Sequence, residues 1–108
     1  MNLKNEWQRT MLHYTAEYGH VDVAKVLIQK GADVNNVDRD KQSPIHRAAL
    51  YGHVEIAKML LQNGADVNAV NKYNWTPLHI ATSNEYVDVA KVLIQNGADV
   101  NAVDKDNE

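Results

Sequence analysis

The feature that most constrains this chain is an internal repeat with a period of 33 residues. The string GADVN begins at Gly31, Gly64 and Gly97, so that successive copies lie 33 residues apart. A longer string, VDVAKVLIQ, occupies residues 21–29 and recurs unchanged at residues 87–95. A chain with such a period is expected to fold as a row of equivalent modules, each of which completes its core against its neighbours.

The repeat divides the whole chain, which we treat as one repeat domain over residues 1–108. The modules cover about residues 5–37, 38–70 and 71–103, and residues 104–108 are the expected start of a truncated fourth module. A length of 108 residues suits one small domain. An apolar content of 44% with 23% charged residues is typical of a globular chain.

The first half of each module predicts a short helix. Ser43 and Thr76 each stand before a proline. Their hydroxyls can cap a helix, and proline suits the first helical position because its missing N–H costs nothing there. Glycine at positions 19 and 52 then supplies the left-handed residue that ends such a helix.

The second half of each module predicts another helix, from about Val21 to Lys30 in the first copy. Apolar residues cover most of its circumference, which is typical of a helix packed on more than one side. Asp22, Lys25 and Gln29 form a polar stripe, so a single narrow face is expected to meet water. A pair of such short helices cannot bury this apolar surface alone, and the modules must stack.

These motifs resemble the ankyrin repeat family over essentially the entire chain. The resemblance is carried by the period and by SPIHRAA at residues 43–49, TPLHIA at 76–81, GH at 52–53 and the three GADVN strings. It implies an all-α solenoid of stacked antiparallel helix pairs. It also implies hairpin-like fingers that project at Asn36 to Gln42 and at Ala69 to Trp75.

The sequence departs from that pattern at a few positions. Met11 replaces the helix-starting proline, which is a mild change because methionine is a good helix former. Glu85 stands where the earlier modules have glycine, so either Asn84 takes the left-handed conformation or the turn is remodelled. The sequence does not decide whether Glu85 or Asn84 takes the left-handed position. Lys41 and Asn74 occupy finger-tip positions where the family usually has glycine.

Composition excludes several classes of partner and compartment. Eleven basic and fourteen acidic residues leave a formal charge of −3, which does not suit a nucleic-acid partner. No segment approaches the roughly 20 apolar residues that span a bilayer, and no apolar leader opens the chain. With no cysteine there is no disulfide and no sulfur-based zinc site. We therefore expect a cytoplasmic protein without a membrane or nucleic-acid partner.

The histidines do not predict a metal site. His13, His46 and His79 recur in register. Equivalent positions of packed helices lie about 8–10 Å apart, whereas metal ligands converge at roughly 2 Å from one ion. The resemblance implies that these histidines connect the capping hydroxyl to the backbone of a neighbouring finger. His20 and His53 are interpreted as local turn residues.

The sequence also argues against an enzyme. It contains no G-x-G-x-x-G, P-loop or H-E-x-x-H motif, and it does not assemble a nucleophile, a base and an orienting group. We expect no cofactor and no catalytic residue.

The aromatic residues indicate a binding surface instead. In the family, the variable contact positions lie on the fingers and on the exposed ends of the first helices. Tryptophan, tyrosine and arginine dominate binding hot spots. Carried onto this chain, the predicted partner-binding residues are Trp7, Arg9, Tyr18, Arg39, Asp40, Gln42, Leu50, Tyr51, Lys72, Tyr73, Trp75, Ser83 and Asn84, with Glu6 and Glu17 beside them.

We therefore predict a non-enzymatic protein–protein interaction module that binds a protein on a concave face of finger tips and first helices. The alternative is a structural spacer, excised from a longer array or engineered as a scaffold, with no specific partner. We expect a monomer. Because Val92, Leu93 and Ile94 repeat the internal apolar pattern, the last module lacks an evident cap, and end-to-end association is the alternative.

Overall fold

The computed structural model describes residues 3–5 and 7–102, and it contains six helices in this part of the chain. The expected start of a fourth module at residues 104–108, and Glu6, lie outside the described residues. The helices are α1 (Met11–Tyr18), α2 (Val21–Gln29), α3 (Pro44–Tyr51), α4 (Val54–Gln62), α5 (Pro77–Ser83) and α6 (Val87–Gln95).

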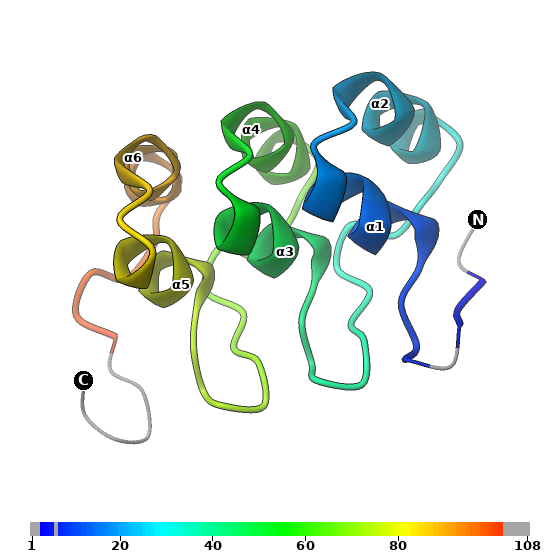
Figure 1. Cartoon of the computed structure of the whole chain (residues 1–108). Helices are drawn as coiled ribbons and strands as arrows, with labels where there is room; N and C mark the ends of the chain where they lie inside the picture. The colour runs from blue at the N-terminus through cyan, green and yellow to red at the C-terminus, as the bar shows by residue number, and fades with distance from the viewer. Residues whose placement is uncertain (1–2, 6, 103–108) are drawn as a thin grey trace.

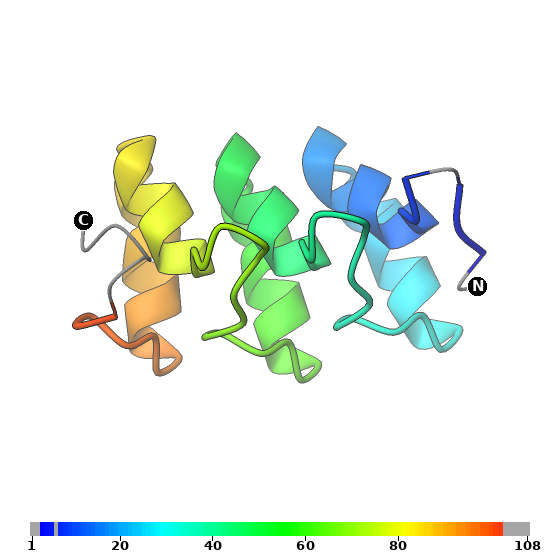
Figure 2. The same ribbon diagram turned by 90° about the horizontal axis from the view of Figure 1, so that it is seen from below.

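The helices form three antiparallel pairs that stand in one row. Figure 1 shows α1, α3 and α5 as an inner layer, α2, α4 and α6 as an outer layer, and long loops that project from the opposite side of the inner layer. We call these loops fingers, with tips at residues 5–9, 38–42 and 71–75. Seen from the finger side, the three pairs repeat as parallel columns (Figure 2). The predicted all-α solenoid of stacked helix pairs is confirmed.

The inner helices begin as their sequences predict. The Oγ1 atoms of Thr10 and Thr76 accept hydrogen bonds from the backbone N–H three residues later, at 3.4 and 3.2 Å. Proline occupies the first turn of α3 and α5, and Met11 takes that place in α1 without loss of the cap. Each cap satisfies a backbone donor that a helix start otherwise leaves unpaired.

Glycine ends two of the inner helices for two separate reasons. Gly19 and Gly52 are left-handed, with φ of 75° and 76°. A Cβ on Gly19 would lie 2.7 Å from the His53 ring, and one on Gly52 would lie 3.1 Å from the Tyr86 ring. The glycine of one module therefore also makes room for a ring of the next.

The structure decides between Glu85 and Asn84 at the end of the third inner helix. Glu85 itself takes the left-handed conformation, with φ of 60°, while Asn84 has φ of −94°. The expectation that Asn84 takes the left-handed position or that the turn is remodelled is therefore wrong. The turn keeps the bond that follows Gly19 and Gly52, with the N–H of Tyr86 donating to the oxygen of Ala81 at 2.9 Å, and Glu85 carries the strain of roughly 1–2 kcal/mol of a left-handed non-glycine residue.

Each finger tip is closed by the side chain of its first residue. The Oδ1 atom of Asp38 accepts hydrogen bonds from the backbone N–H groups of Asp40 and Gln42, at 2.8 and 3.0 Å. Asn5 and Asn71 make the equivalent pair of bonds. This Asx-type closure explains why Asn or Asp recurs there. The residue next to the end of each tip is left-handed, and these residues are Gln8, Lys41 and Asn74.

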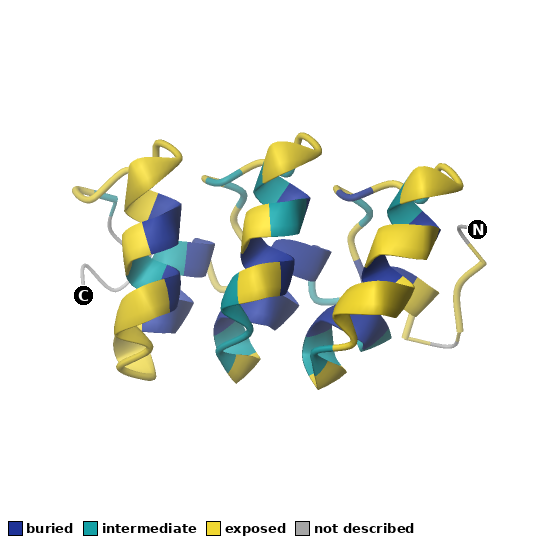
Figure 3. Cartoon of the chain, turned by 90° about the horizontal axis from the view of Figure 1, so that it is seen from above, coloured by how far each residue is buried: buried dark blue, intermediate teal, exposed yellow. Residues whose placement is uncertain are grey.

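The core runs along the row between the two layers of helices. Alanines at positions 48, 49 and 81 are fully buried, which lets the slim inner helices pack closely, and Leu27, Leu60 and Leu93 are buried in the outer layer. Figure 3 shows the buried sides of the outer helices turned inward along the row and their exposed sides on the outside.

The expectation that α2 exposes only one narrow polar stripe is wrong. Val23 and Val26 are 46% and 52% exposed, whereas their equivalents in α6, Val89 and Val92, are buried. The reason is position in the row, because α4 and α6 each pack against a preceding outer helix and α2 has none among the described residues. Within residues 3–5 and 7–102, no helix has the length and apolar character needed to cross a membrane.

Candidate functional site

The histidines at the start of the inner helices connect each module to the finger of the next. The His13 Nε2 atom donates to the backbone oxygen of Gln42 at 2.8 Å, and His46 Nε2 donates to that of Trp75 at 3.2 Å. On the other side of each ring, Nδ1 accepts from the backbone N–H of Thr10 or Ser43, at 3.0 and 3.1 Å. The contact that the family resemblance implied is therefore present in the first two modules.

This geometry requires neutral rings. Nε2 must carry the proton that it donates to a carbonyl, and Nδ1 must be free to accept, so only the Nε2-protonated tautomer fits. Burial lowers the pKa of both His13 and His46 below the ordinary value, although the hydrogen bonds to Gln42 and Trp75 oppose that change. Burial outweighs these hydrogen bonds, so both histidines act as fixed structural links in their neutral form.

His53 is more than the local turn residue that we expected. Its Nε2 donates to the backbone oxygen of Glu17 at 2.9 Å, across the boundary between the first two modules. The Glu17 carboxylate also pairs with the guanidinium of Arg47, and that guanidinium lies 5.4 Å from the centre of the Tyr51 ring. Glu17, at the end of α1, is thus held by contacts that cross the module boundary, whereas Tyr51, at the end of α3, contacts Arg47 of its own helix.

Backbone hydrogen bonds and ion pairs join the finger tips side by side. The N–H of Arg39 donates to the oxygen of Trp7 at 3.0 Å, and the N–H of Lys72 donates to that of Asp40 at 2.9 Å. The Lys72 ammonium also lies 2.8 Å from the Asp40 carboxylate. Their hydrogen bond lowers the pKa of Asp40 and raises that of Lys72. Both groups therefore stay charged at neutral pH, and they tie the second tip to the third.

A groove lies between the second and third fingers and the inner helices behind them. Its volume is about 330 Å³. Its lining comes from the two fingers and from α3 and α5, and the lining residues are Gln42, Leu50, Asn71, Tyr73, Trp75, Ile80 and Asn84. The Oε1 atom of Gln42 is buried there without a hydrogen-bond partner among the described residues. Such a groove offers apolar contact together with one unpaired acceptor.

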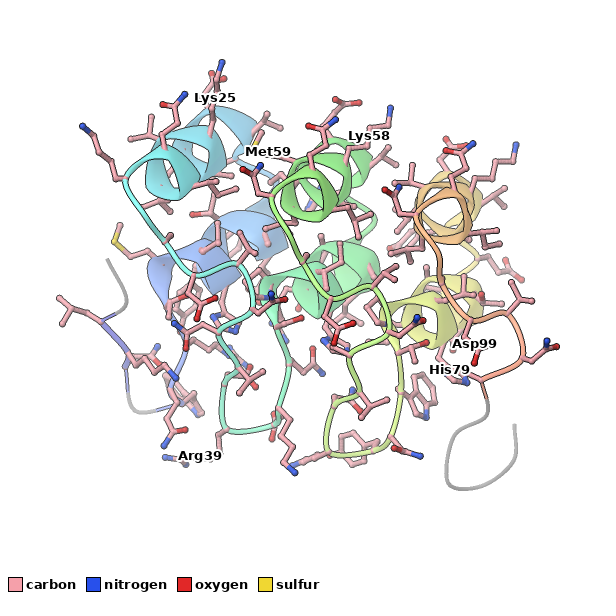
Figure 4. All side chains as sticks on the ribbon, turned by 180° about the vertical axis from the view of Figure 1, so that it is seen from behind. Lys25, Arg39, Lys58, Met59, His79 and Asp99 are labelled. Carbon is pink, nitrogen blue, oxygen red and sulfur yellow. The ribbon has the colours of Figure 1, made fainter. Side chains whose placement is uncertain are left out.

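The structure brings five of the predicted partner-binding residues together around this groove, and they are Gln42, Leu50, Tyr73, Trp75 and Asn84. Tyr51 and Tyr73 are 44% and 50% exposed. The remaining predicted residues do not line this groove. Ser83 lines a different hollow, beside α5. Arg39 lies at the tip of the second finger, whereas Lys25 and Lys58 point outward from the outer helices (Figure 4).

Some predicted residues have structural roles that limit their availability. Arg9 pairs with the buried carboxylate of Asp38 at 3.4 Å and lies 6.0 Å from the centre of the Tyr14 ring. Asp40 is engaged with Lys72. Trp7 and Tyr18 are exposed at the first finger and at the end of α1.

Sequence reasoning did not single out Asn71 and Ile80, which line the groove, or Arg47, which fixes Tyr51. A signal was present for Arg47, because its equivalents in the other modules are Tyr14 and Ile80. A charge at a position otherwise occupied by large uncharged side chains indicates a specific partner.

Metal-binding groups do not come together in the described part of the chain. Across residues 3–5 and 7–102, no group of three or more His, Asp and Glu side chains could hold a metal ion. The histidines that recur in register are instead the links described above.

Comparison with known proteins gives a consistent result along the chain. The family model described as ankyrin repeats in three copies matches residues 1–71, and the model of a single ankyrin repeat matches residues 73–105.

Two curated proteins share similar segments. Alpha-latrocrustotoxin-Lt1a of Latrodectus tredecimguttatus is 49% identical over 45 residues, which are 42% of this chain and 3% of that protein. Ankyrin repeat-containing protein P1E11.10 of Schizosaccharomyces pombe is 36% identical over 44 residues, which are 41% of this chain and 21% of that protein. In both cases the similar segment is a small part of the relative's length.

Proposed function

Because this chain belongs to the ankyrin repeat family, whose repeats generally serve as non-enzymatic protein–protein interaction modules, we propose that it binds a protein partner on its concave face of finger tips and inner helices. The groove between the second and third fingers is the centre of this surface. Leu50, Trp75 and Ile80 give it an apolar lining. Tyr51 and Tyr73 provide exposed rings, at the end of α3 and on the third finger.

The observation that carries this proposal is the fixed position of the aromatic and polar groups around the groove. Tyr51 is held by Arg47. The finger that bears Tyr73 is held by the Lys72 backbone bond and by its ion pair with Asp40. A surface that is ordered before binding loses little conformational entropy on binding, so a few aromatic anchors suffice for useful affinity.

Site-specific photo-crosslinking tests this function. A photoreactive amino acid replaces Tyr73 in one protein and Lys25 in a matched control, since Lys25 points away from the fingers on α2 (Figure 4). Each protein is irradiated in a lysate of the source organism. We expect a discrete crosslinked product from position 73 that the control does not form.

A competition step assigns the product to this surface. Excess unlabelled chain should abolish the crosslink, whereas a Tyr51→Ala, Tyr73→Ala double variant with an unchanged circular-dichroism spectrum should compete at least about tenfold less well. Equal competition by the two proteins would reject this surface. The absence of any crosslink specific to position 73 would favour the alternative of a structural spacer.

A further inference from the structure

The repeat allows the groove between the second and third fingers to be compared with the equivalent place one module earlier. Each residue that lines the groove has an equivalent 33 positions earlier, between the first and second fingers. The seven residues that line the groove are all uncharged, whereas five of their seven equivalents are charged. We call these five residues the charged cluster, and they are Arg9, Glu17, Asp38, Asp40 and Arg47.

Ion pairs occupy the charged cluster. The Glu17 carboxylate pairs with the Arg47 guanidinium, and their side chains are only 12% and 8% exposed. Arg9 lies 3.4 Å from the carboxylate of Asp38, which is 2% exposed. An apolar side chain that entered this place would separate these pairs and leave a buried charge without its partner, which is strongly unfavourable.

The groove between the second and third fingers has the opposite chemistry. Leu50 and Ile80 stand there in place of the Glu17–Arg47 pair, and Tyr73 and Trp75 add aromatic surface. A charged side chain would lose its water in this groove and gain no opposite charge from the lining, whereas an apolar side chain gains by burial.

The size of the groove sets how much of a partner it can hold. Its volume is about 330 Å³. This is at the lower end of the range of roughly 300–1,000 Å³ that is typical of small-ligand sites. Such a volume suits one large side chain that anchors a longer partner segment.

Building on the proposed function, we propose that this groove takes one large, uncharged, apolar side chain of the protein partner, and that the charged cluster excludes the same side chain one module earlier. Repeated backbone geometry alone would let a partner bind in two registers, shifted by one module. The buried ion pairs of the charged cluster leave one register. The site therefore selects its partner by rejection at one place as well as by attraction at the other.

The repeat also supplies matched substitutions, because each place already accommodates the residues of the other. The opening variant carries Glu17→Leu and Arg47→Ile, which copy Leu50 and Ile80 into the charged cluster. Both charges leave together, so neither stays buried alone. The bond from His53 to the backbone oxygen at position 17 is retained.

Two further variants alter the groove itself. The closing variant carries Leu50→Glu and Ile80→Arg, which is the reverse exchange. Trp75→Gln copies the residue at position 42 and buries no charge, so it tests the groove even where the closing variant does not fold. Circular dichroism shows which variants keep the fold.

NMR titration of the full chain tests the proposal, with N-acetyltryptophanamide as an uncharged probe with a large apolar side chain. In the wild type, we expect shifts of the backbone amide signals around Leu50 and Ile80, and none around Glu17 and Arg47. The closing variant and Trp75→Gln should bind about tenfold more weakly. The opening variant should show a second set of shifts, around positions 17 and 47. The amides of N-acetyllysine and N-acetylglutamate are charged comparators that should not bind in the groove.

Three results would overturn the proposal: equal shifts at both places in the wild type, unchanged binding by Trp75→Gln, or equally tight binding of a charged comparator. A crosslink from position 73 without probe binding would also overturn it and would leave the proposed function standing. Selective probe binding without that crosslink would reject the protein partner of the proposed function and would support the selectivity of the groove.

Discussion

Mild acidification should destabilise this protein through its buried histidines. His13 and His46 are neutral in the folded state, with Nδ1 accepting a backbone N–H and Nε2 donating to the next finger. A proton on Nδ1 would place two donors face to face at each site. Burial also lowers the pKa of both rings in the folded protein below the unfolded value of about 6.5.

The direction of the effect follows from linkage. Above about pH 6.5 both states are neutral and the histidines contribute no pH dependence. Below that pH the unfolded chain binds protons that the folded chain excludes, so the free energy of unfolding falls by up to about 1.4 kcal/mol per pH unit for each ring. The two rings together give a loss of up to about 3 kcal/mol between about pH 8 and 5.5. The loss continues until the lowered folded-state pKa is reached.

Urea unfolding followed by circular dichroism at several pH values measures this loss. The midpoint should fall between about pH 8 and 5.5, in a range above the ordinary pKa of most carboxylates. The His46→Gln variant should lose about half of the pH dependence, since one of the two rings is removed. His20→Gln is the matched control, because His20 is exposed. The same free energy of unfolding at about pH 8 and about pH 5.5 would show that the buried histidines do not destabilise the folded protein on acidification.

Three further substitutions test the module boundaries. Glu85→Gly should stabilise the chain at low protein concentration by about 1 kcal/mol, since it relieves a left-handed non-glycine residue, and thermal unfolding measures this. Gly52→Ala should lower the melting temperature, because its φ of 76° and the Tyr86 ring at 3.1 Å both oppose a methyl group; an unchanged melting temperature would contradict the packing described. Glu17→Ala should cost about 3 kcal/mol in urea unfolding, because it leaves the buried Arg47 charge without its carboxylate. The double variant Glu17→Ala, Arg47→Met should recover most of the stability that Glu17→Ala loses, because it no longer buries an unpaired charge.

Local sequence signals predicted the helices and their order. The caps at Thr10 and Thr76 and the turns at Gly19 and Gly52 depend on residues within a few positions of each other, so their geometry follows from the types present. The 33-residue period then places the modules side by side without further information.

Contacts between modules were harder to predict. His53 and Arg47 bond to Glu17 across 36 and 30 residues, and neither pairing has a local signal. The left-handed Glu85 is a similar case, because its local preference opposes the conformation that it adopts. For the candidate site, the residue types on the fingers indicated a surface, but the groove itself depends on how two fingers and two helices meet.

The histidine links have a direction along the chain. The start of α1 depends on a carbonyl of the second finger, and the start of α3 depends on one of the third. Through these links, local opening of a finger removes an acceptor from the start of the inner helix before it, whereas opening at the N-terminal side removes none from the start of the next inner helix. Amide hydrogen exchange at the starts of α1 and α3 should accordingly respond to opening of the finger that follows each helix.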